Sequence, residues 1–526
     1  MKFFKQNRAL APVVIAQAAI IFIASCAAPA SWAQTQPPGV GATSAALPNL
    51  GDGSDMAASA ERRLGDRIAR ELYRDPDYVD DPVVMEYVQG IWQPLLAAAR
   101  LRGELPPELD ENYAWEILLG RDRTVNAFAL PGGYLGLHLG LVAVVTSRDE
   151  LASVLAHELS HVTQRHISRM MTRQSGMAPW VLGAMILGAL AASKSPGAAN
   201  AMIVGGQAVA AQTQLNFSRD MEREADRVGF GVSTQAGFAP EGFVSMFEKL
   251  QQASRLNDTG NFPYLRSHPL STERMADMQA RIPSPASGAK RPVGVQELDQ
   301  AMIAARARVL SNSAVDALRV WAVEADAAQL ARLSPAQQVG ALYGATLAAI
   351  KLRDFADAQT AWTRLRDVTR VDAAASRLAR LLGAELWLAQ GDSGRALALV
   401  QNPDGKPASP SRAELFLAAQ ASTRGEALAS STQNLQTWVA GHPRDAQAWQ
   451  LLSSAYAAQG RTLSSIRALA EVDVAQLDYP AALTRFKTAQ DWARKGGAGL
   501  DHIEASIVDT RARQMELLVR EQALER

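Results

Sequence analysis

The chain contains a single cysteine, Cys26, among its 526 residues. One cysteine cannot form an intramolecular disulfide, so no cross-link of this kind can stabilise the fold. A metal site in the folded part of the chain must therefore take its ligands from histidine, aspartate or glutamate side chains.

The chain also lacks an excess of charge of either sign. It has 53 lysines and arginines and 53 aspartates and glutamates. A neutral chain has no long-range attraction to nucleic acid, and we find no nucleic-acid-binding module, so we expect no nucleic-acid partner. Apolar residues make up 48% of the sequence, which excludes a wholly disordered protein, and the length predicts two or more domains.

The first 33 residues are typical of an export signal. Three of the first eight residues are lysine or arginine, and an apolar run follows over residues 9–28. Ser31 and Ala33 then supply the small residues of a cleavage site. We expect residues 1–33 to be a signal peptide of a protein exported from the cytoplasm.

Two other interpretations of this start stay open. Residues 23–26, I-A-S-C, are similar to a bacterial lipobox, which would make Cys26 a lipid-bearing N-terminus at a membrane. The apolar run could also remain as an uncleaved anchor.

Composition divides the rest of the chain into four segments. Residues 34–58 are rich in Gly, Ser, Pro and Thr, and we expect them to lack fixed structure. Residues 59–282 mix apolar helical patterns with strand-like stretches, and residues 283–294 have the composition of a linker. Residues 295–526 are rich in Ala and Leu and almost entirely helical in pattern.

The last segment is weakly repetitive. Trp449, Leu452 and Tyr456 have the W-x2-L-x3-Y spacing of a tetratricopeptide helix. Gly391, Gly425 and Gly460 recur at nearly the same period, so we expect stacked helical pairs. A generic helical bundle is the alternative.

One motif carries candidate metal ligands. In L-A-S-V-L-A-H-E-L-S-H, His157 and His161 are four residues apart, so a helix places them on one face. Both imidazoles can bind one zinc ion, and Glu158 can reach a water molecule beside it as a general base. A motif with only three fixed residues also occurs by chance in large proteins. A catalytic zinc ion further needs a third protein ligand, which must come from elsewhere in the chain.

A second helical stretch supplies candidates for that ligand. Glu222 and Asp226 are also four residues apart and share a face. One carboxylate can bind the ion while the other accepts the outer N–H of a ligand histidine. Glu224 is a rival ligand, and a solvated charged helix is the alternative.

A hairpin is predicted just before the H-E-x-x-H motif. Residues 125–142 have the pattern strand, turn, strand, with the turn at residues 131–133. An edge strand here could pair with an extended peptide, with Asn126 and Ala127 holding the substrate backbone. An ordinary hairpin packed on helices is the alternative.

The order of four motifs resembles the M48 family of zinc metallopeptidases. These motifs are N-A-F-x-x-P-G-G from Asn126, H-E-x-x-H from His157, E-x-x-A-D-R from Glu222, and S-H-P around His268. The resemblance covers residues 59–282 by motifs and 295–526 by architecture only. It implies a mainly α fold: a zincin-like protease domain with a small β-hairpin or sheet, followed by a tetratricopeptide-like solenoid.

The resemblance also implies roles for single residues. His157, His161 and Glu222 would bind one Zn²⁺ per chain, which demotes Glu224. Asp226 would orient a ligand from behind it, and Glu158 would be the catalytic base.

A regulatory role for His268 also follows from the resemblance, as a latch or fourth ligand at the metal. Two alternatives stay open for this residue. It could be a helix-start residue before Pro269, or it could donate to the oxyanion.

Function and partners follow from the resemblance as well. It implies an exported metalloendopeptidase for quality control of outer-membrane proteins, acting on misfolded or stalled clients and aiding the barrel-assembly machinery. A chaperone-like assembly factor with a latched site is the alternative. The apolar hairpin predicted at residues 178–212 could be a lid, could contact the outer membrane, or could pack in the core. We assign no role to the remaining histidines, which are His138, His166, His442 and His502.

Overall fold

The computed structural model describes residues 56–173, 218–256, 263–282, 297–401, 410–495 and 501–524. Several predicted features lie wholly or mostly outside these residues: the export signal 1–33 with Cys26, the segment 34–58, the hairpin 178–212 and the linker 283–294. The described residues all belong to one compact unit, Ser54–Arg526. The domain boundaries given above stay predictions.

The predicted fold class is confirmed: helices dominate, and the described residues contain one small sheet. Its strand order is β1-β2-β4-β3. The strands are β1 (Tyr78–Val79), β2 (Glu116–Gly120), β3 (Ala127–Leu130) and β4 (Tyr134–His138). Strand β2 pairs in parallel with β4, and β3 pairs antiparallel with β4. This order leaves β3 at one edge of the sheet.

The predicted hairpin is confirmed in its turn and corrected at its end. A 3-10 turn over Pro131–Gly133 joins β3 to β4, and Gly132 and Gly133 have φ of 72° and 84°. A Cβ at Gly132 would lie 2.7 Å from the Cα of Arg62 in α1, so the backbone there also needs the missing side chain. The second strand stops at His138, because Leu139–Val144 form helix α4.

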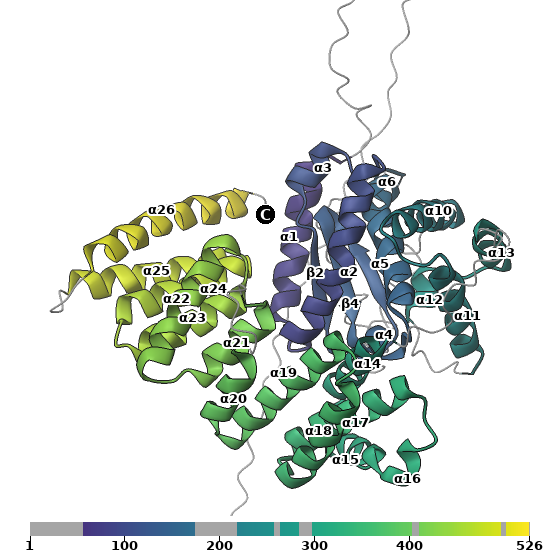
Figure 1. Ribbon diagram of the computed structural model, residues 1–526. Coiled ribbons are helices and arrows are strands. Elements are labelled where there is room, and N and C mark those ends of the chain that lie inside the picture. Colours follow the sequence, from purple (N-terminus) through teal and green to yellow (C-terminus); the bar gives the residue numbers. More distant parts are fainter. Residues whose placement is uncertain are drawn as a thin grey trace, which may run out of the picture. The chain divides into compact units, whose positions relative to one another are not determined.

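Ten helices of the described residues belong to the part that surrounds the sheet. They are α1 (Ala58–Arg74), α2 (Pro82–Leu101), α3 (Pro107–Asn112), α4 (Leu139–Val144), α5 (Arg148–Thr163), α6 (His166–Arg173), α10 (Arg219–Gln235), α11 (Glu241–Leu256), α12 (Pro263–Ser267) and α13 (Thr272–Arg281). Helix α5 begins where the Ser147 side chain accepts a hydrogen bond from the Glu150 N–H, a standard N-cap. It packs against β3, α2, α10 and α11, so it is surrounded on most sides (Figure 1).

The rest of the described chain is helical. It comprises α14 (Leu298–Ser311), α15 (Val315–Ala322), the 3-10 turn Val323–Ala325, α16 (Ala327–Leu330), α17 (Pro335–Leu352), α18 (Phe355–Thr369), α19 (Ala373–Gln390), α20 (Ser393–Val400), α21 (Arg412–Ala421), α22 (Gly425–Gly441), α23 (Ala446–Ala458), α24 (Thr462–Ala475), α25 (Tyr479–Arg494) and α26 (His502–Leu524). From α17 to α26, each helix contacts the next one along the chain. None of the described helices is both long and apolar enough to cross a membrane.

The recurring glycines lie between consecutive helices. Gly391 separates α19 from α20, Gly425 begins α22 after residues 422–424 that connect it to α21, and Gly460 lies between α23 and α24. All three have positive φ, which explains why glycine recurs at this period. Trp449 and Tyr456 are buried in α23 at 8% and 2% exposure. The arrangement is solenoid-like, and its assignment to tetratricopeptide repeats stays a prediction.

A buried arginine joins the two predicted domains. Arg306 of α14 is 4% exposed and donates to both carboxylate oxygens of Asp81 at 2.8 and 2.7 Å. It also donates to the Tyr343 hydroxyl at 3.0 Å and lies 2.9 Å from a Glu385 carboxylate oxygen. Asp81 caps the N-terminus of α2, so one guanidinium connects the sheet region to α17 and α19.

Candidate metal centre

Helix α5 presents His157, Glu158 and His161 inside the protein. Their exposures are 2%, 0% and 0%. The one-face spacing predicted for the two histidines holds, because their Nε2 atoms lie 3.0 Å apart. Apolar side chains elsewhere on the helix are buried as well: Leu151 and Leu155 are each exposed by 1% or less.

Helix α10 brings two carboxylates to the same place. Glu222 Oε2 lies 3.5 Å from His157 Nε2, and Glu222 Oε1 lies 3.5 Å from His161 Nε2. Asp226 Oδ1 lies 3.0 Å from the other ring nitrogen of His157, Nδ1. The approach depends on Gly229, where a Cβ would lie 3.0 Å from the backbone of Ala156. Glu222 thus lies on the Nε2 side of the two histidines and Asp226 on the Nδ1 side of His157, while their roles as ligand and supporting residue stay predictions.

His268 enters the site from the turn between α12 and α13. Its Nδ1 lies 3.0 Å from Glu222 Oε1 and 3.3 Å from His157 Nε2. Its Nε2 lies 3.5 Å from Glu158 Oε1. The Tyr264 ring stacks on it at a centroid distance of 4.7 Å. His268 is 1% exposed, so the structure buries this histidine beside the predicted ligands.

Four residues, His157, His161, Glu222 and His268, form what we call the His/Glu cluster. One ligand atom from each lies within 4.8 Å of all the others. Ligands of a tetrahedral zinc ion at about 2.1 Å lie roughly 3.4 Å from one another. The contacts between cluster atoms run from 3.0 to 3.5 Å, which matches that spacing.

The burial of Glu158 supports the same conclusion. Neither of its carboxylate oxygens has a hydrogen-bond partner among the described residues. A buried carboxylate is costly unless a cation or a hydrogen-bond donor compensates it. The donor set of imidazoles and a carboxylate, with a second carboxylate beside it, therefore fits a divalent metal such as zinc.

The charges in the site favour a cation. Burial opposes a charge on His157, but Asp226 and Glu222 raise its pKa to about 10. Burial would raise the pKa of Glu222, yet His268 and His157 hold that pKa well below its usual value. The Glu222 carboxylate thus stays ionised and stabilises positive charge next to it.

Sequence reasoning missed Arg274. Its guanidinium donates to both Asp226 oxygens at 2.6 and 2.8 Å and lies 2.7 Å from Glu222 Oε2. Arg274 is 4% exposed and holds the two carboxylates side by side. Its position at the end of the R-S-H-P-L-S-T-E-R stretch was visible, but nothing in the spacing connects it to α10.

Sequence reasoning also missed His166. Its Nδ1 lies 2.9 Å from His161 Nδ1, behind the cluster. Its Nε2 lies 3.1 Å from Glu224 Oε2. Glu224, the rival ligand, therefore contacts His166 rather than the cluster. His138 pairs with Thr124 at 2.9 Å, and neither it, His442 nor His502 belongs to the cluster.

The predicted substrate strand borders the site. Helix α5 contacts β3, and the Val125 carbonyl just before β3 accepts a hydrogen bond from the Tyr264 N–H at 3.3 Å. Asn126 is 6% exposed, and its Oδ1 has no hydrogen-bond partner among the described residues. Ala127 is fully buried. Their substrate-binding roles stay predictions.

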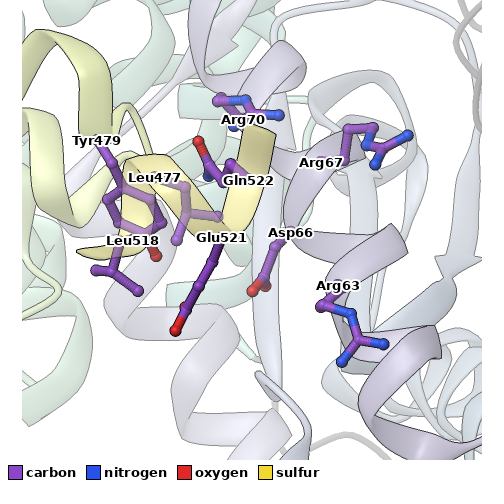
Figure 2. Close-up of a pocket in the computed structure, with 9 residues that line it drawn as sticks. All are labelled: Arg63, Asp66, Arg67, Arg70, Leu477, Tyr479, Leu518, Glu521 and Gln522. Atoms are coloured by element: carbon purple, nitrogen blue, oxygen red, sulfur yellow. The ribbon is translucent and has the colours of Figure 1, made fainter. Parts of the chain in front are cut away.

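A separate cavity of about 150 Å³ lies between α1 and the helical tail (Figure 2). Arg63, Arg67 and Arg70 line it from α1, and Tyr479 and Glu521 line it from α25 and α26. Its lining contains no histidine, so it lacks the imidazole ligands that the His/Glu cluster offers.

The comparisons with known proteins agree with this geometry. Residues 87–282 match the profile described as "Peptidase family M48". A Vibrio cholerae protein provisionally named a beta-barrel assembly-enhancing protease is 33% identical over 61% of this chain and 63% of its own length. The beta-barrel assembly-enhancing protease of Yersinia pestis is 28% identical over 81% of this chain and 83% of its own.

The Escherichia coli beta-barrel assembly-enhancing protease is 31% identical over 60% of this chain and 61% of its own length. The chain thus matches less than two thirds of the length of the Vibrio and Escherichia relatives. Residues 87–282 contain strands β2, β4 and β3, helix α5 and every member of the His/Glu cluster. Residues 87–282 are therefore similar to the metallopeptidases of family M48.

Proposed function

We propose that this chain is an exported zinc metalloendopeptidase that hydrolyses peptide bonds of misfolded or stalled outer-membrane proteins. The observation that carries the proposal is the burial of Glu158 directly beside the His/Glu cluster. An H-E-x-x-H helix with a third carboxylate ligand is the arrangement used by hydrolytic zinc sites.

Each residue has a defined task in this mechanism. His157, His161 and Glu222 would hold the zinc ion. When bound, zinc polarises a substrate carbonyl and lowers the pKa of a water molecule towards about 7. Glu158 accepts the proton of the attacking water and then delivers it to the leaving amine. Asp226 holds His157 at its outer nitrogen.

His268 supports a latched resting state. Its Nδ1 lies 3.0 Å from Glu222 and 3.3 Å from His157 Nε2, among the ligand atoms. We propose that it occupies the fourth position at the metal and leaves when the substrate arrives. The alternative, donation to the oxyanion, would use its Nε2, which lies 3.5 Å from Glu158.

Substrate would enter along β3. An extended peptide can add to an edge strand through main-chain hydrogen bonds, and β3 is such a strand next to α5. The unpaired Oδ1 of Asn126 can accept a backbone N–H of that peptide. The Tyr264 N–H now contacts Val125 at the same end of β3, so movement of α12 would release both His268 and this edge.

The client class rests on the names of the relatives, which are called beta-barrel assembly-enhancing proteases. We infer a periplasmic protein that acts on outer-membrane proteins and on the barrel-assembly machinery. Contact of residues 178–212 with the outer membrane remains part of this proposal and lies outside the described residues.

A chaperone-like assembly factor is the second candidate. The observation that favours it is the burial of every cluster member at 2% exposure or less. A site this closed would support assembly by binding while cutting rarely.

The test of the proposal is casein hydrolysis by zinc-loaded protein carrying His268→Ala, with Glu158→Gln/His268→Ala as the blank. The first variant removes the latch, so an idle enzyme is not mistaken for an inert one. We expect hydrolysis well above the blank. Equal rates at full zinc occupancy would contradict a general endopeptidase. Full barrel-assembly support in cells by the Glu158→Gln chain would assign that support to binding.

A further inference from the structure

The two histidines of the motif hold their outer ring nitrogens in different ways. His157 Nδ1 lies 3.0 Å from a carboxylate oxygen of Asp226. His161 Nδ1 lies 2.9 Å from Nδ1 of another histidine, His166. His166 is fully buried, so its contacts are made within the protein.

Only one arrangement of protons satisfies the second contact when both rings are neutral and His161 binds a metal through Nε2. The Nε2 of His161 faces the cluster, 3.0 Å from His157 Nε2 and 3.5 Å from Glu222. A metal ligand must offer a lone pair at that atom, which places the His161 proton on Nδ1. His161 Nδ1–H then donates to His166 Nδ1, and the His166 proton lies on Nε2.

A carboxylate lies where it can accept the Nε2–H proton of His166. His166 Nε2 lies 3.1 Å from Glu224 Oε2, and Arg169 donates to the same oxygen at 2.8 Å. The arginine keeps Glu224 ionised and in place, so the carboxylate accepts the His166 N–H. A hydrogen-bonded series thus runs from Arg169 through Glu224 and His166 to His161.

The backbone explains how a residue five positions after His161 reaches it. On a continuous helix, residues five apart differ by about 140° and face different sides. Helix α5 instead ends at Thr163, and Arg165 takes a left-handed conformation with φ of 52°. Arg165 is held there by an ion pair with Glu61 at 3.2 Å. The chain therefore turns back, and His166 begins α6 behind His161.

We propose that His166 is a positioning residue that fixes the tautomer and orientation of His161, and that Glu224 and Arg169 hold His166 for this task. The proposal rests on the proposed function only in taking zinc as the ion. It assigns to the two motif histidines unequal supports, one a buried carboxylate and the other a neutral imidazole. Glu224 and Arg169, at 27% and 35% side-chain exposure, then influence the metal from the protein surface.

The experiment measures zinc affinity of the full chain by competition with a chelator. His166→Leu removes the acceptor for His161, and we expect about 10- to 100-fold weaker zinc binding, the usual cost of losing such a partner. His166→Asn restores an acceptor near the lost Nδ1 and should recover most of the affinity. His138→Leu, which removes a buried histidine outside the cluster, is the matched control and should leave zinc affinity unchanged.

Two further measurements keep the proposal testable if His166→Leu does not fold. Glu224→Ala changes a partly exposed residue and should weaken zinc binding, while Glu224→Gln, which still accepts a hydrogen bond, should weaken it less. In zinc-loaded protein labelled with ¹⁵N-histidine, NMR should show the His161 proton on Nδ1 and the His166 proton on Nε2.

Unchanged zinc affinity in His166→Leu, or in Glu224→Ala where the former does not fold, would overturn the proposal. A His161 proton on Nε2 would also overturn it. These results are independent of peptide hydrolysis. If the affinity series holds while casein stays intact, the positioning role stands and the peptidase proposal fails.

Discussion

Three residues of the His/Glu cluster are each held by a second side chain that is distant in sequence or lies across a turn. Asp226 supports His157, His166 supports His161, and Arg274 supports Glu222. A ligand whose ring or carboxylate is already oriented loses less conformational freedom when the ion binds. Metal affinity should therefore depend on residues that never contact the ion.

Replacing Asp226 with alanine tests this at one residue. The change removes the carboxylate 3.0 Å from His157 Nδ1 and leaves Arg274 without its bidentate partner. We expect zinc affinity to fall about 10- to 100-fold, as for other supporting residues. Chelator competition would measure it. Asp220→Ala on the same helix, an exposed residue paired with Arg223, is the control. Equal affinities in the two variants would contradict the supporting role.

The sequence predicted the members of the His/Glu cluster better than the residues that hold them in place. His157, Glu158 and His161 lie within five residues, where helix geometry alone fixes their relation. Asp226 could be predicted because it follows Glu222 by one helical turn. Arg274 and His166 could not, because their contacts depend on how α13 meets α10 and on the left-handed turn at Arg165.

Among the elements, the crossing of α10 over α5 determines the site. Gly229 permits it, since a Cβ there would already lie 3.0 to 3.1 Å from the backbone of Ala156 and His157. The sequence predicted both helices and the hairpin from their patterns. It could not predict this crossing, because a glycine inside a helix does not indicate which other helix packs against it.

A branched side chain at this crossing should disturb the metal centre. We expect Gly229→Val to push α10 from α5, to separate Glu222 from the histidines, and to weaken zinc binding at least about tenfold. Isothermal titration of the metal-free protein with zinc would measure it. Gly441→Val is the control, because a Cβ at Gly441 meets nothing within 4 Å. Wild-type affinity in Gly229→Val would show that the close approach is not needed.

At the scale of the whole molecule, the buried ion pair between Arg306 and Asp81 joins the sheet region to the helical tail. Its removal from one side leaves a buried charge without compensation, which costs about 3 to 5 kcal/mol. We expect Arg306→Met to lower the free energy of unfolding by that amount. The double variant Arg306→Met/Asp81→Asn should recover part of it. Chemical denaturation would measure both, with exposed Arg319→Met as the control. A double variant as unstable as the single one would contradict this account.

The same pair predicts a pH dependence. Burial would raise the pKa of Asp81, but Arg306 and the Val84 N–H hold it below its usual value. A lowered folded-state pKa means that the pair stabilises the protein above the unfolded value of about 3.9 and that this stability is lost as the pH falls through the folded pKa. Denaturation midpoints should therefore decline below about pH 4 less steeply in Asp81→Asn than in the parent chain. Parallel declines would exclude Asp81 as the cause.

The organisation of the whole chain was only partly predictable. The glycines at 391, 425 and 460 predicted the junctions between tail helices, because a backbone with positive φ favours glycine. The ion pairs between the tail and the sheet region could not be predicted from any sequence pattern, since Arg306 and Asp81 are 225 residues apart.

The most direct measurement of the central claim is anomalous diffraction at the zinc edge from crystals of the full chain. The account predicts one peak per chain, within bonding distance of His157, His161 and Glu222. It also predicts that the peak is lost in His157→Ala. A fully occupied zinc site elsewhere, or none at the His/Glu cluster after zinc loading, would contradict the account.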